Sequence, residues 1–245
     1  MPKLFVCSDI HSAYTPWMKA LNEAGFDENN PDHKIIVCGA LLDRMNESLQ
    51  VYELTKDMIN KGKMIYVLGN HELLMMQCLK RGFPLGHDWH NGTATSIINL
   101  APDAKTFEEA CEVVYGKIKP LLDNTVNYFE TKNYIFVHSW VPALSQKGMF
   151  YKFNPDWRNA TQKEWDDAMW VNPFDMAARG LNQTGKTIVF GHFHTSYPRA
   201  KYDGEPEFED GANFDIYYGD GFVGIDACTA HSKKVNVLVV EDEFI

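Results

Sequence analysis

The sequence predicts an α/β fold in which parallel strands alternate with crossover helices. Short apolar runs rich in β-branched and aromatic residues recur along the chain, and helical patterns separate the first three of them. The 245 residues are 45% hydrophobic, which is enough to build a sizeable core. Because parallel strands need a crossover connection, the first half is predicted to alternate strand and helix three times.

The expected strands are the runs of apolar residues, a pattern typical of strands buried in a core. They cover residues 4–7, 35–38, 64–68, 134–137, 187–190, 221–225 and 235–240. The expected helices carry apolar residues three and four positions apart and cover residues 16–24, 48–61 and 72–81. The last two strand runs flank a turn at 232–234, which predicts a closing hairpin.

Two regions interrupt the alternation of strand and helix. Residues 82–127 contain a Gly-rich loop with histidines (82–92) followed by helical stretches, and residues 145–185 form a second such region. We expect a single domain over residues 1–245, with both regions as helical and loop insertions over one edge of the sheets.

Charge and cysteine content exclude several classes of function. The formal net charge of −10 repels phosphate backbones and anionic lipid, so non-specific nucleic-acid binding is not expected. The five cysteines include no C-x-x-C pair, which favours free buried thiols in a reducing compartment. No signal-type segment or run of transmembrane length is present, so we expect a cytoplasmic protein that does not contact the membrane.

Residues suited to metal binding or acid–base chemistry follow most of the expected strands. The motifs are SDIH (8–11), GALLDR (39–44), GNHE (69–72), HS (138–139) and GHFH (191–194). Open α/β sheets bind ligands beyond the carboxyl ends of their strands, so these motifs can converge on one site. A lone D-x-H could be a capping aspartate beside an incidental histidine. Packing alone, however, does not explain four histidine-bearing strand ends.

In this order, and over most of the chain, the motifs resemble the calcineurin-like metallophosphoesterase superfamily, nearest to its phosphoprotein-phosphatase-type bacterial and phage branch. The segment WHNG (89–92) is similar to the W-x-N-G loop that follows GNHE in that branch. The resemblance implies a four-layer α/β/β/α sandwich with two mixed sheets. It also implies an enzyme that hydrolyses a phosphoester with the help of metal ions.

The resemblance further implies a role for each site residue. One metal would be held by Asp9, His11 and His194, and the other by Asn70, His138 and His192. A hydroxide bridging the two metals, about 3.5–4 Å apart, would attack phosphorus in line. His71 would be the general acid, oriented by Asp43, while Arg44 and Asn70 would bind the phosphoryl oxygens. The expected cofactors are two divalent ions, Mn²⁺ first, with Fe, Zn, Ni or Mg as alternatives.

Position 40 departs from the family motif G-D-x-x-D-R-G. The first aspartate of that motif bridges both metals, whereas this chain has Ala40, and Met45 replaces the final glycine. Either a natural pseudoenzyme has lost the bridge, or the aspartate was deliberately changed to trap a substrate. Since every other ligand position is filled, we favour a deliberate Asp-to-Ala change in an otherwise intact site, which would leave this chain inactive.

The substrate is expected to be a nucleotide or another small phosphoester. Two arginines that grip phosphate in phosphoprotein phosphatases are replaced here by Leu68 and Asn172, and His194 resembles a residue of the phosphodiesterase-like members. Two alternatives stay open: a serine/threonine phosphoprotein phosphatase, and a catalytically dead fold acting as a ligand-binding sensor or scaffold. Most aromatic residues suit the core, with Trp89, Phe193 and Tyr197 as candidate cleft residues.

Overall fold

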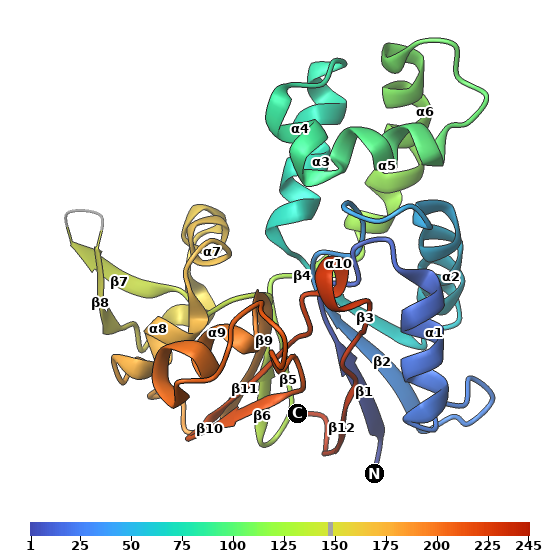
Figure 1. The fold of residues 1–245 in the computed structure, drawn as a ribbon. Helices are drawn as coiled ribbons and strands as arrows, with labels where there is room; N and C mark the ends of the chain where they lie inside the picture. Colours follow the sequence, from blue (N-terminus) through green and yellow to red (C-terminus); the bar gives the residue numbers. More distant parts are fainter. Residues whose placement is uncertain (147–148) are drawn as a thin grey trace.

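Two five-stranded mixed sheets lie at the centre of the computed structural model, which describes residues 1–146 and 149–245 (Figure 1). The first sheet has the order β12-β1-β2-β3-β4. Its strands are β1 (Lys3–Cys7), β2 (His33–Cys38), β3 (Met64–Val67), β4 (Thr125–Val126) and β12 (Leu238–Glu241). All neighbours in it are parallel except β12, which runs antiparallel to β1.

The second sheet has the order β10-β11-β9-β6-β5, with β6, β9 and β11 parallel and the two outer strands antiparallel to their neighbours. Its strands are β5 (Phe129–Glu130), β6 (Tyr134–Phe136), β9 (Thr187–His194), β10 (Tyr217–Gly219) and β11 (Phe222–Asp226). A separate antiparallel pair, β7 (Ala143–Gln146) and β8 (Met149–Phe153), lies beside it. Residues 147–148, which belong to the expected insertion over 145–185, lie outside the described residues.

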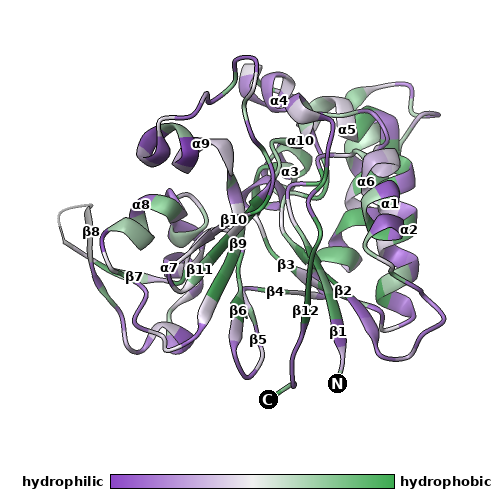
Figure 2. Ribbon diagram, turned by 60° about the horizontal axis from the view of Figure 1, so that its bottom comes forward, coloured by the Kyte–Doolittle hydropathy of each residue, from purple (hydrophilic) through white to green (hydrophobic). Residues whose placement is uncertain are grey.

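Successive side chains along a strand point to opposite faces of its sheet, and this alternation explains why layers of other residues lie on both sides of each sheet. In β1, Leu4 and Val6 join a cluster shared by both sheets, which contains Val189 of β9. The intervening Phe5 and Cys7 join a different cluster, with helical residues of the first half. Because successive side chains point to opposite faces, a run that is apolar throughout must be covered on both sides. The apolar strands at the centre of Figure 2 therefore require helices outside both sheets.

Helices cover both outer faces, and the predicted four-layer α/β/β/α sandwich is confirmed. The first sheet is covered by α1 (Tyr14–Glu23) and α2 (Ser48–Asn60), and the second by α8 (Pro173–Ala178) (Figure 1). The remaining helices are α3 (Asn70–Arg81), α4 (Gly86–Asn91), α5 (Thr93–Leu100), α6 (Phe107–Leu122), η1 (Trp157–Asn159), α7 (Gln162–Ala168), α9 (Ser196–Pro198), η2 (Arg199–Asp203) and α10 (Thr229–Ser232). None of the helices among the described residues is long and apolar enough to cross a bilayer.

All seven expected strand runs overlap a strand and all three expected helices are present, but the closing hairpin was wrong. β11 and β12 lie in different sheets, because β12 pairs with the open edge of β1 while β11 pairs with β9. Alternation in β12 buries Leu238 and Val240 against the core between the sheets. Part of the expected loop over 82–92 is helical, as α4. The five cysteines are free thiols, four of them buried, as expected.

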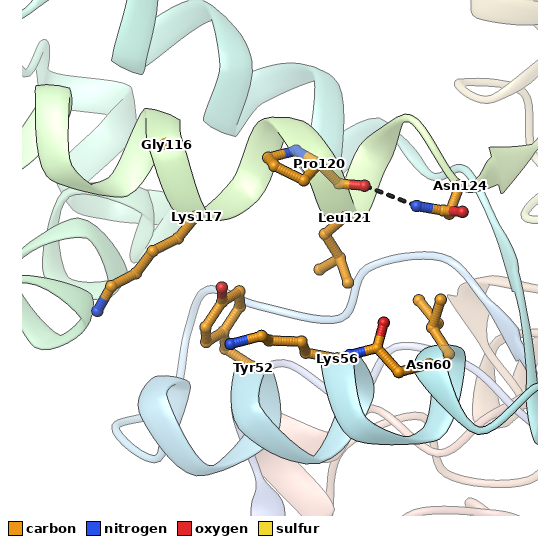
Figure 3. A pocket seen from close by; sticks show the side chains of 9 residues that line it. Tyr52, Lys56, Asn60, Gly116, Lys117, Pro120, Leu121 and Asn124 are labelled. Carbon is orange, nitrogen blue, oxygen red and sulfur yellow. Dashed lines mark hydrogen bonds between the residues drawn. The ribbon is translucent and has the colours of Figure 1, made fainter.

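A hollow of about 310 Å³ lies between α2 and α6, away from the strand ends (Figure 3). Gly116 and Pro120 lie one helical turn apart on its α6 side, opposite Tyr52 and Lys56 of α2. Gly116 has no side chain, which leaves room on this face of α6. Pro120 lies inside the helix and has no N–H to bond the carbonyl four residues earlier. No heavy atom lies within 4 Å of the place that a Cβ on Gly116 would occupy.

Candidate active site

The carboxyl ends of the parallel strands of both sheets meet at one edge of the molecule. Backbone hydrogen bonds join the loops after β1 and β2, with the Asp9 N–H donating to the Gly39 carbonyl and the His11 N–H to that of Ala40, each at 3.1 Å. A Cβ on Gly191 of β9 would lie 2.2 Å from Asp9 Oδ2. The two sheets can approach this closely because Gly191 has no side chain.

A cavity of about 340 Å³ opens at this edge and gathers most of the predicted site. Its lining includes Asp9, His11, Arg44, Asn70, His71, His192 and His194. The other three predicted positions lie directly behind this lining. Asp43 contacts His71, His138 contacts Asn70, and the fully buried Ala40 accepts its hydrogen bond from His11. The strand-end motifs therefore do converge.

His71 and Asp43 form a buried pair. His71 Nδ1 lies 2.8 Å from Asp43 Oδ2, and the Thr93 hydroxyl donates to the same carboxylate oxygen at 2.7 Å. The Asp43 N–H donates to Ser96 Oγ at 2.9 Å, so two residues of α5 hold this aspartate. A carboxylate on Nδ1 keeps the proton on that nitrogen and directs Nε2 elsewhere. The pair can hold or deliver a proton at Nε2.

Three further histidines are each held by a hydrogen bond to the backbone. His11 Nδ1 lies 3.1 Å from the Leu42 carbonyl, and His138 Nδ1 lies 2.8 Å from the Cys38 carbonyl. Since a carbonyl only accepts, Nδ1 carries the proton and Nε2 presents a lone pair. His192 bonds the backbone of Trp170, and burial lowers its pKa to about 2. Burial also lowers the pKa of His11 and of His138, so all three rings are neutral.

Oxygen atoms face these lone pairs. His138 Nε2 lies 2.8 Å from the side-chain oxygen of Asn70, and His11 Nε2 lies 3.7 Å from Asp9 Oδ1. Burial raises the pKa of Asp9 to about 6, while burial and the charge of Asp9 raise the pKa of Asp226 well above its usual value. These buried electron-pair donors and the two neighbouring carboxylates favour a positive charge between them.

Backbone strain is concentrated in the strand-end loops. Nine non-glycine residues in the described part of the chain have positive φ, and all but Lys233 lie in these loops or, for His192, near the carboxyl end of β9. The eight are Asp9, His11, Ser12, Ala40, Asp43, Arg44, His192 and Cys228. Left-handed conformations cost an ordinary residue about 1–2 kcal/mol and persist where the surrounding structure enforces them, often at functional sites.

The carboxylate of Glu72, in the GNHE motif, fastens the loop after β2. It is buried and accepts hydrogen bonds from the N–H groups of Gly69, Ala40 and Leu41 at 2.9–3.0 Å. Three backbone donors that converge on one carboxylate keep position 40 against the start of α3. Glu72 is a positioning residue for the site.

Glu72→Gln is expected to lower the free energy of unfolding by about 2 kcal/mol, because the new amide N–H₂ cannot accept from the backbone donors that its oxygen served. Chemical denaturation measures this loss. The matched control is Glu53→Gln on α2, where the side chain is 56% exposed and the change is expected to stay within about 0.5 kcal/mol. Equal losses in the two variants would contradict the role assigned to Glu72.

Gly92→Ala is expected to be destabilising by at least about 1–2 kcal/mol, because φ there is +84° and the added Cβ would lie 2.2 Å from the Arg44 backbone nitrogen. Gly116→Ala is the control, since it adds the same methyl group to open space in a helix and should stabilise by up to about 1 kcal/mol. Thermal midpoints of the two variants should move in opposite directions. Shifts of the same sign would show that backbone conformation at Gly92 does not constrain Arg44.

Residues 2–196 match the model of a protein family described as calcineurin-like phosphoesterases. The match covers most of the chain and includes every strand-end motif named above. The chain belongs to the calcineurin-like phosphoesterase family. The resemblance found in the motifs is thereby confirmed, and the chain belongs with hydrolases of phosphoester bonds that use divalent metal ions.

Sequence identity to individual known proteins is low. The chain is 26% identical over 145 residues to a bis(5'-nucleosyl)-tetraphosphatase, PrpE, of Halalkalibacterium halodurans, and the match spans 56% of each protein. A protein serine/threonine phosphatase of Saccharomyces cerevisiae aligns with a TM-score of 0.57 at 11% identity, over 98% of this chain and 80% of that one. A Shewanella protein-tyrosine phosphatase aligns with a TM-score of 0.54 at 14% identity, over 98% and 76%. The two solved structures show a shared fold alone.

The donors in the cavity suit the divalent metals of this family. Nitrogen from imidazole combined with carboxylate or amide oxygen is a ligand set for Mn²⁺, Fe²⁺ or Zn²⁺. His11 and His138 each donate the other ring N–H to a backbone carbonyl, as histidine ligands of metals commonly do. Among the described residues, no three His, Cys, Asp or Glu side chains already surround a common point. The donors therefore form two pairs, Asp9 with His11 and Asn70 with His138.

Position 40 lies between these two pairs. The carbonyl of Ala40 accepts from the His11 N–H, and the preceding Gly39 approaches the His138 ring so closely that a Cβ there would lie 2.5 Å from Nδ1. Ala40 has φ 51°, a conformation in which aspartate and asparagine are several-fold enriched over alanine. The backbone at position 40 is thus better suited to aspartate than to the alanine present.

Two other residues named in the sequence analysis, His194 and Asn172, have polar partners within the protein. His194 lies in the cavity, with Nδ1 2.8 Å from Ser196 Oγ and Nε2 3.4 Å from Glu207 Oε1, so a metal would have to displace Glu207 from it. Its ligand role stays a prediction. Asn172 caps α8, accepting from the N–H groups of Phe174 and Asp175 at 3.0 and 3.3 Å. This side chain is used for helix capping.

Five of the twelve residues that line the cavity were not predicted as site residues, and Asp226 and Phe208 are two of them. Asp226 ends β11 and pairs in register with His194. It follows the apolar run 221–225 directly, so the signal that found Asp9 and His138 also applies to it. Phe208 lines the cavity from an irregular segment, where no sequence pattern marks it. Trp89, Phe193 and Tyr197, the aromatic residues expected there, are not among the lining residues.

Proposed function

We propose that this chain, with aspartate restored at position 40, hydrolyses a phosphoester of a small nucleotide substrate. One observation carries the proposal: His71, backed by Asp43, lines the same cavity as Asp9, His11 and Asn70, with His138 directly behind Asn70. A proton donor beside two sets of metal-type donors is what phosphoester hydrolysis needs, since the substrate is anionic and its leaving oxygen is basic.

Asp9, His11 and His194 would hold one divalent ion, and Asn70, His138 and His192 the other, with Mn²⁺ as the first choice. When bound, these ions neutralise phosphate charge and activate water. Arg44 lines the cavity, and its guanidinium would bind phosphoryl oxygens together with the Asn70 amide. His71 Nε2 would pass a proton to the leaving oxygen, while Asp43 accepts from Nδ1–H and stabilises the protonated ring.

The small-substrate assignment has two supports. The curated relative named above is a tetraphosphatase of bis(5'-nucleosyl) compounds, although the chain spans only 56% of its length. The cavity of about 340 Å³ also matches the lower range of small-ligand sites. The yeast phosphatase shares the fold at 11% identity and adds no weight to a phosphoprotein substrate.

Metal content tests the proposal. After reconstitution with Mn²⁺ and dialysis, the Ala40→Asp protein should retain two equivalents by elemental analysis. A further Asp9→Asn and His138→Ala change in that protein should abolish retention, because one donor is lost from each pair. Metal retention without turnover of any phosphoester would favour a binding module, and no retention at all would overturn the proposal.

A further inference from the structure

Phe208 forms part of the cavity wall, yet the catalytic scheme above gives it no role. It lies in the segment 204–216, between η2 and β10, and its side chain is 47% exposed. Burial of a phenylalanine ring is favourable, so a ring left half-exposed beside a polar cavity is available to contact a ligand.

The ring is held in place by neighbouring aromatic rings. It packs against His194 with ring centroids 4.8 Å apart and against His231 at 5.5 Å, and the buried Phe214 lies 6.4 Å away. The N–H groups of Glu207 and Phe208 both donate to the Glu209 carboxylate at 3.2 Å. An aromatic surface fixed before binding loses little conformational entropy when a ligand stacks on it.

Charge distinguishes the surroundings of Phe208 from those of Arg44. The segment around Phe208 carries Glu205, Glu207, Glu209 and Asp210, whereas the cavity also contains Arg44 and His71. Phosphate is therefore repelled near Phe208 and attracted to Arg44, so the group that meets Phe208 must not be anionic. Glu207 Oε1, beside His194, can accept a hydrogen bond from such a group.

We propose that Phe208 is the stacking platform for the base of a nucleotide whose phosphate contacts Arg44 in the same cavity, an inference that rests on the proposed function. A nucleobase offers a π face for the ring and, in adenine, guanine or cytosine, an N–H for Glu207. A phosphotyrosyl ring would offer the face but no N–H donor. Phe208 is thus a specificity-determining residue.

Binding measurements on the chain as it stands, in Mn²⁺ buffer, test the inference without requiring turnover. AMP is the probe with a base, ribose 5-phosphate is the probe without one, and phenyl phosphate supplies an aryl ring alone. Calorimetry should show AMP bound about tenfold more tightly than ribose 5-phosphate. Phe208→Leu should remove this preference and leave ribose 5-phosphate unchanged, whereas Phe208→Tyr should retain it.

Tyr218→Leu is the control, since it removes an aromatic ring that is 66% exposed on β10 and outside the cavity lining, and AMP affinity should not change. Equal affinity for AMP and ribose 5-phosphate would overturn the role of Phe208 while leaving the proposed function intact. So would phenyl phosphate binding more tightly than AMP. If none of the three probes binds and the Ala40→Asp protein hydrolyses no phosphoester, the proposed function fails together with this inference.

Discussion

Ala40→Asp is expected to raise Mn²⁺-dependent hydrolysis of p-nitrophenyl phosphate by about a hundredfold or more over the chain as it stands. The backbone at position 40 already has the left-handed conformation that aspartate tolerates, and it lies between the Asp9–His11 and Asn70–His138 pairs. A carboxylate there would give both pairs a common anionic ligand. Initial rates with and without Mn²⁺ measure the gain.

Ala40→Asn is the matched control for this substitution. Asparagine has nearly the same size and the same tolerance of positive φ, but it lacks the negative charge, so activity should rise far less. If a fully metal-loaded Ala40→Asp protein stays inert on a broad panel of phosphoesters, the reading of Ala40 as a lost metal ligand is wrong. Equal gains in both variants would instead assign the effect to side-chain size.

His71→Asn in the Ala40→Asp protein is expected to lower kcat on glycerol 2-phosphate by about 100- to 10,000-fold. This substrate releases an alkoxide, which needs a proton as it leaves, and His71 is held for that task by Asp43 at 2.8 Å. The loss on p-nitrophenyl phosphate should be much smaller, because its leaving group departs without a proton. Steady-state kinetics on the two substrates give the ratio.

Asp43→Asn separates positioning from proton transfer. It keeps the shape of the buried partner but removes the charge that stabilises a protonated His71, so the loss should show the same dependence on leaving group with a smaller size. Equal losses on both substrates in the His71→Asn variant would show that His71 binds the substrate and is not its proton donor. Circular dichroism of the two variants checks that the fold is retained.

Local patterns in the chain were sufficient for much of the fold and the site. Continuous apolar runs marked strands that are covered on both faces. In β1, for example, Leu4 and Phe5 pack into different cores on opposite faces of the sheet. Polar residues directly after such runs marked most of the site, because parallel strands end at a common edge. The pairing of β12 with β1 was missed, since strand patterns identify strands and not their neighbours.

Phe208 was missed because it lies in an irregular segment. Phe208 lies in 204–216, where neither period nor motif distinguishes a cavity residue from a surface one. Trp89, Phe193 and Tyr197, the aromatic residues expected in the cleft, do not line the cavity. An aromatic ring contacts a ligand only if loop closure brings it there, and that depends on contacts such as those of Phe208 with His194 and His231.

Residue types and their order along the chain were thus enough to identify the family, the strand-end motifs and the departure at Ala40, because these properties depend on covalent sequence and short-range periodicity. The resemblance implied that Asp43 orients His71 and that His138 and Asn70 share a metal. The direct contacts of His138 with Asn70 and of His71 with Asp43, across separations of 68 and 28 residues, come from the folded structure, which also added Asp226 and Phe208 to the cavity. The His138–Asn70 contact depends on how the two sheets meet, at glycines that permit close approach, whereas the His71–Asp43 contact joins segments that follow neighbouring strands of the first sheet. That packing is a long-range property, which no single segment of the chain encodes.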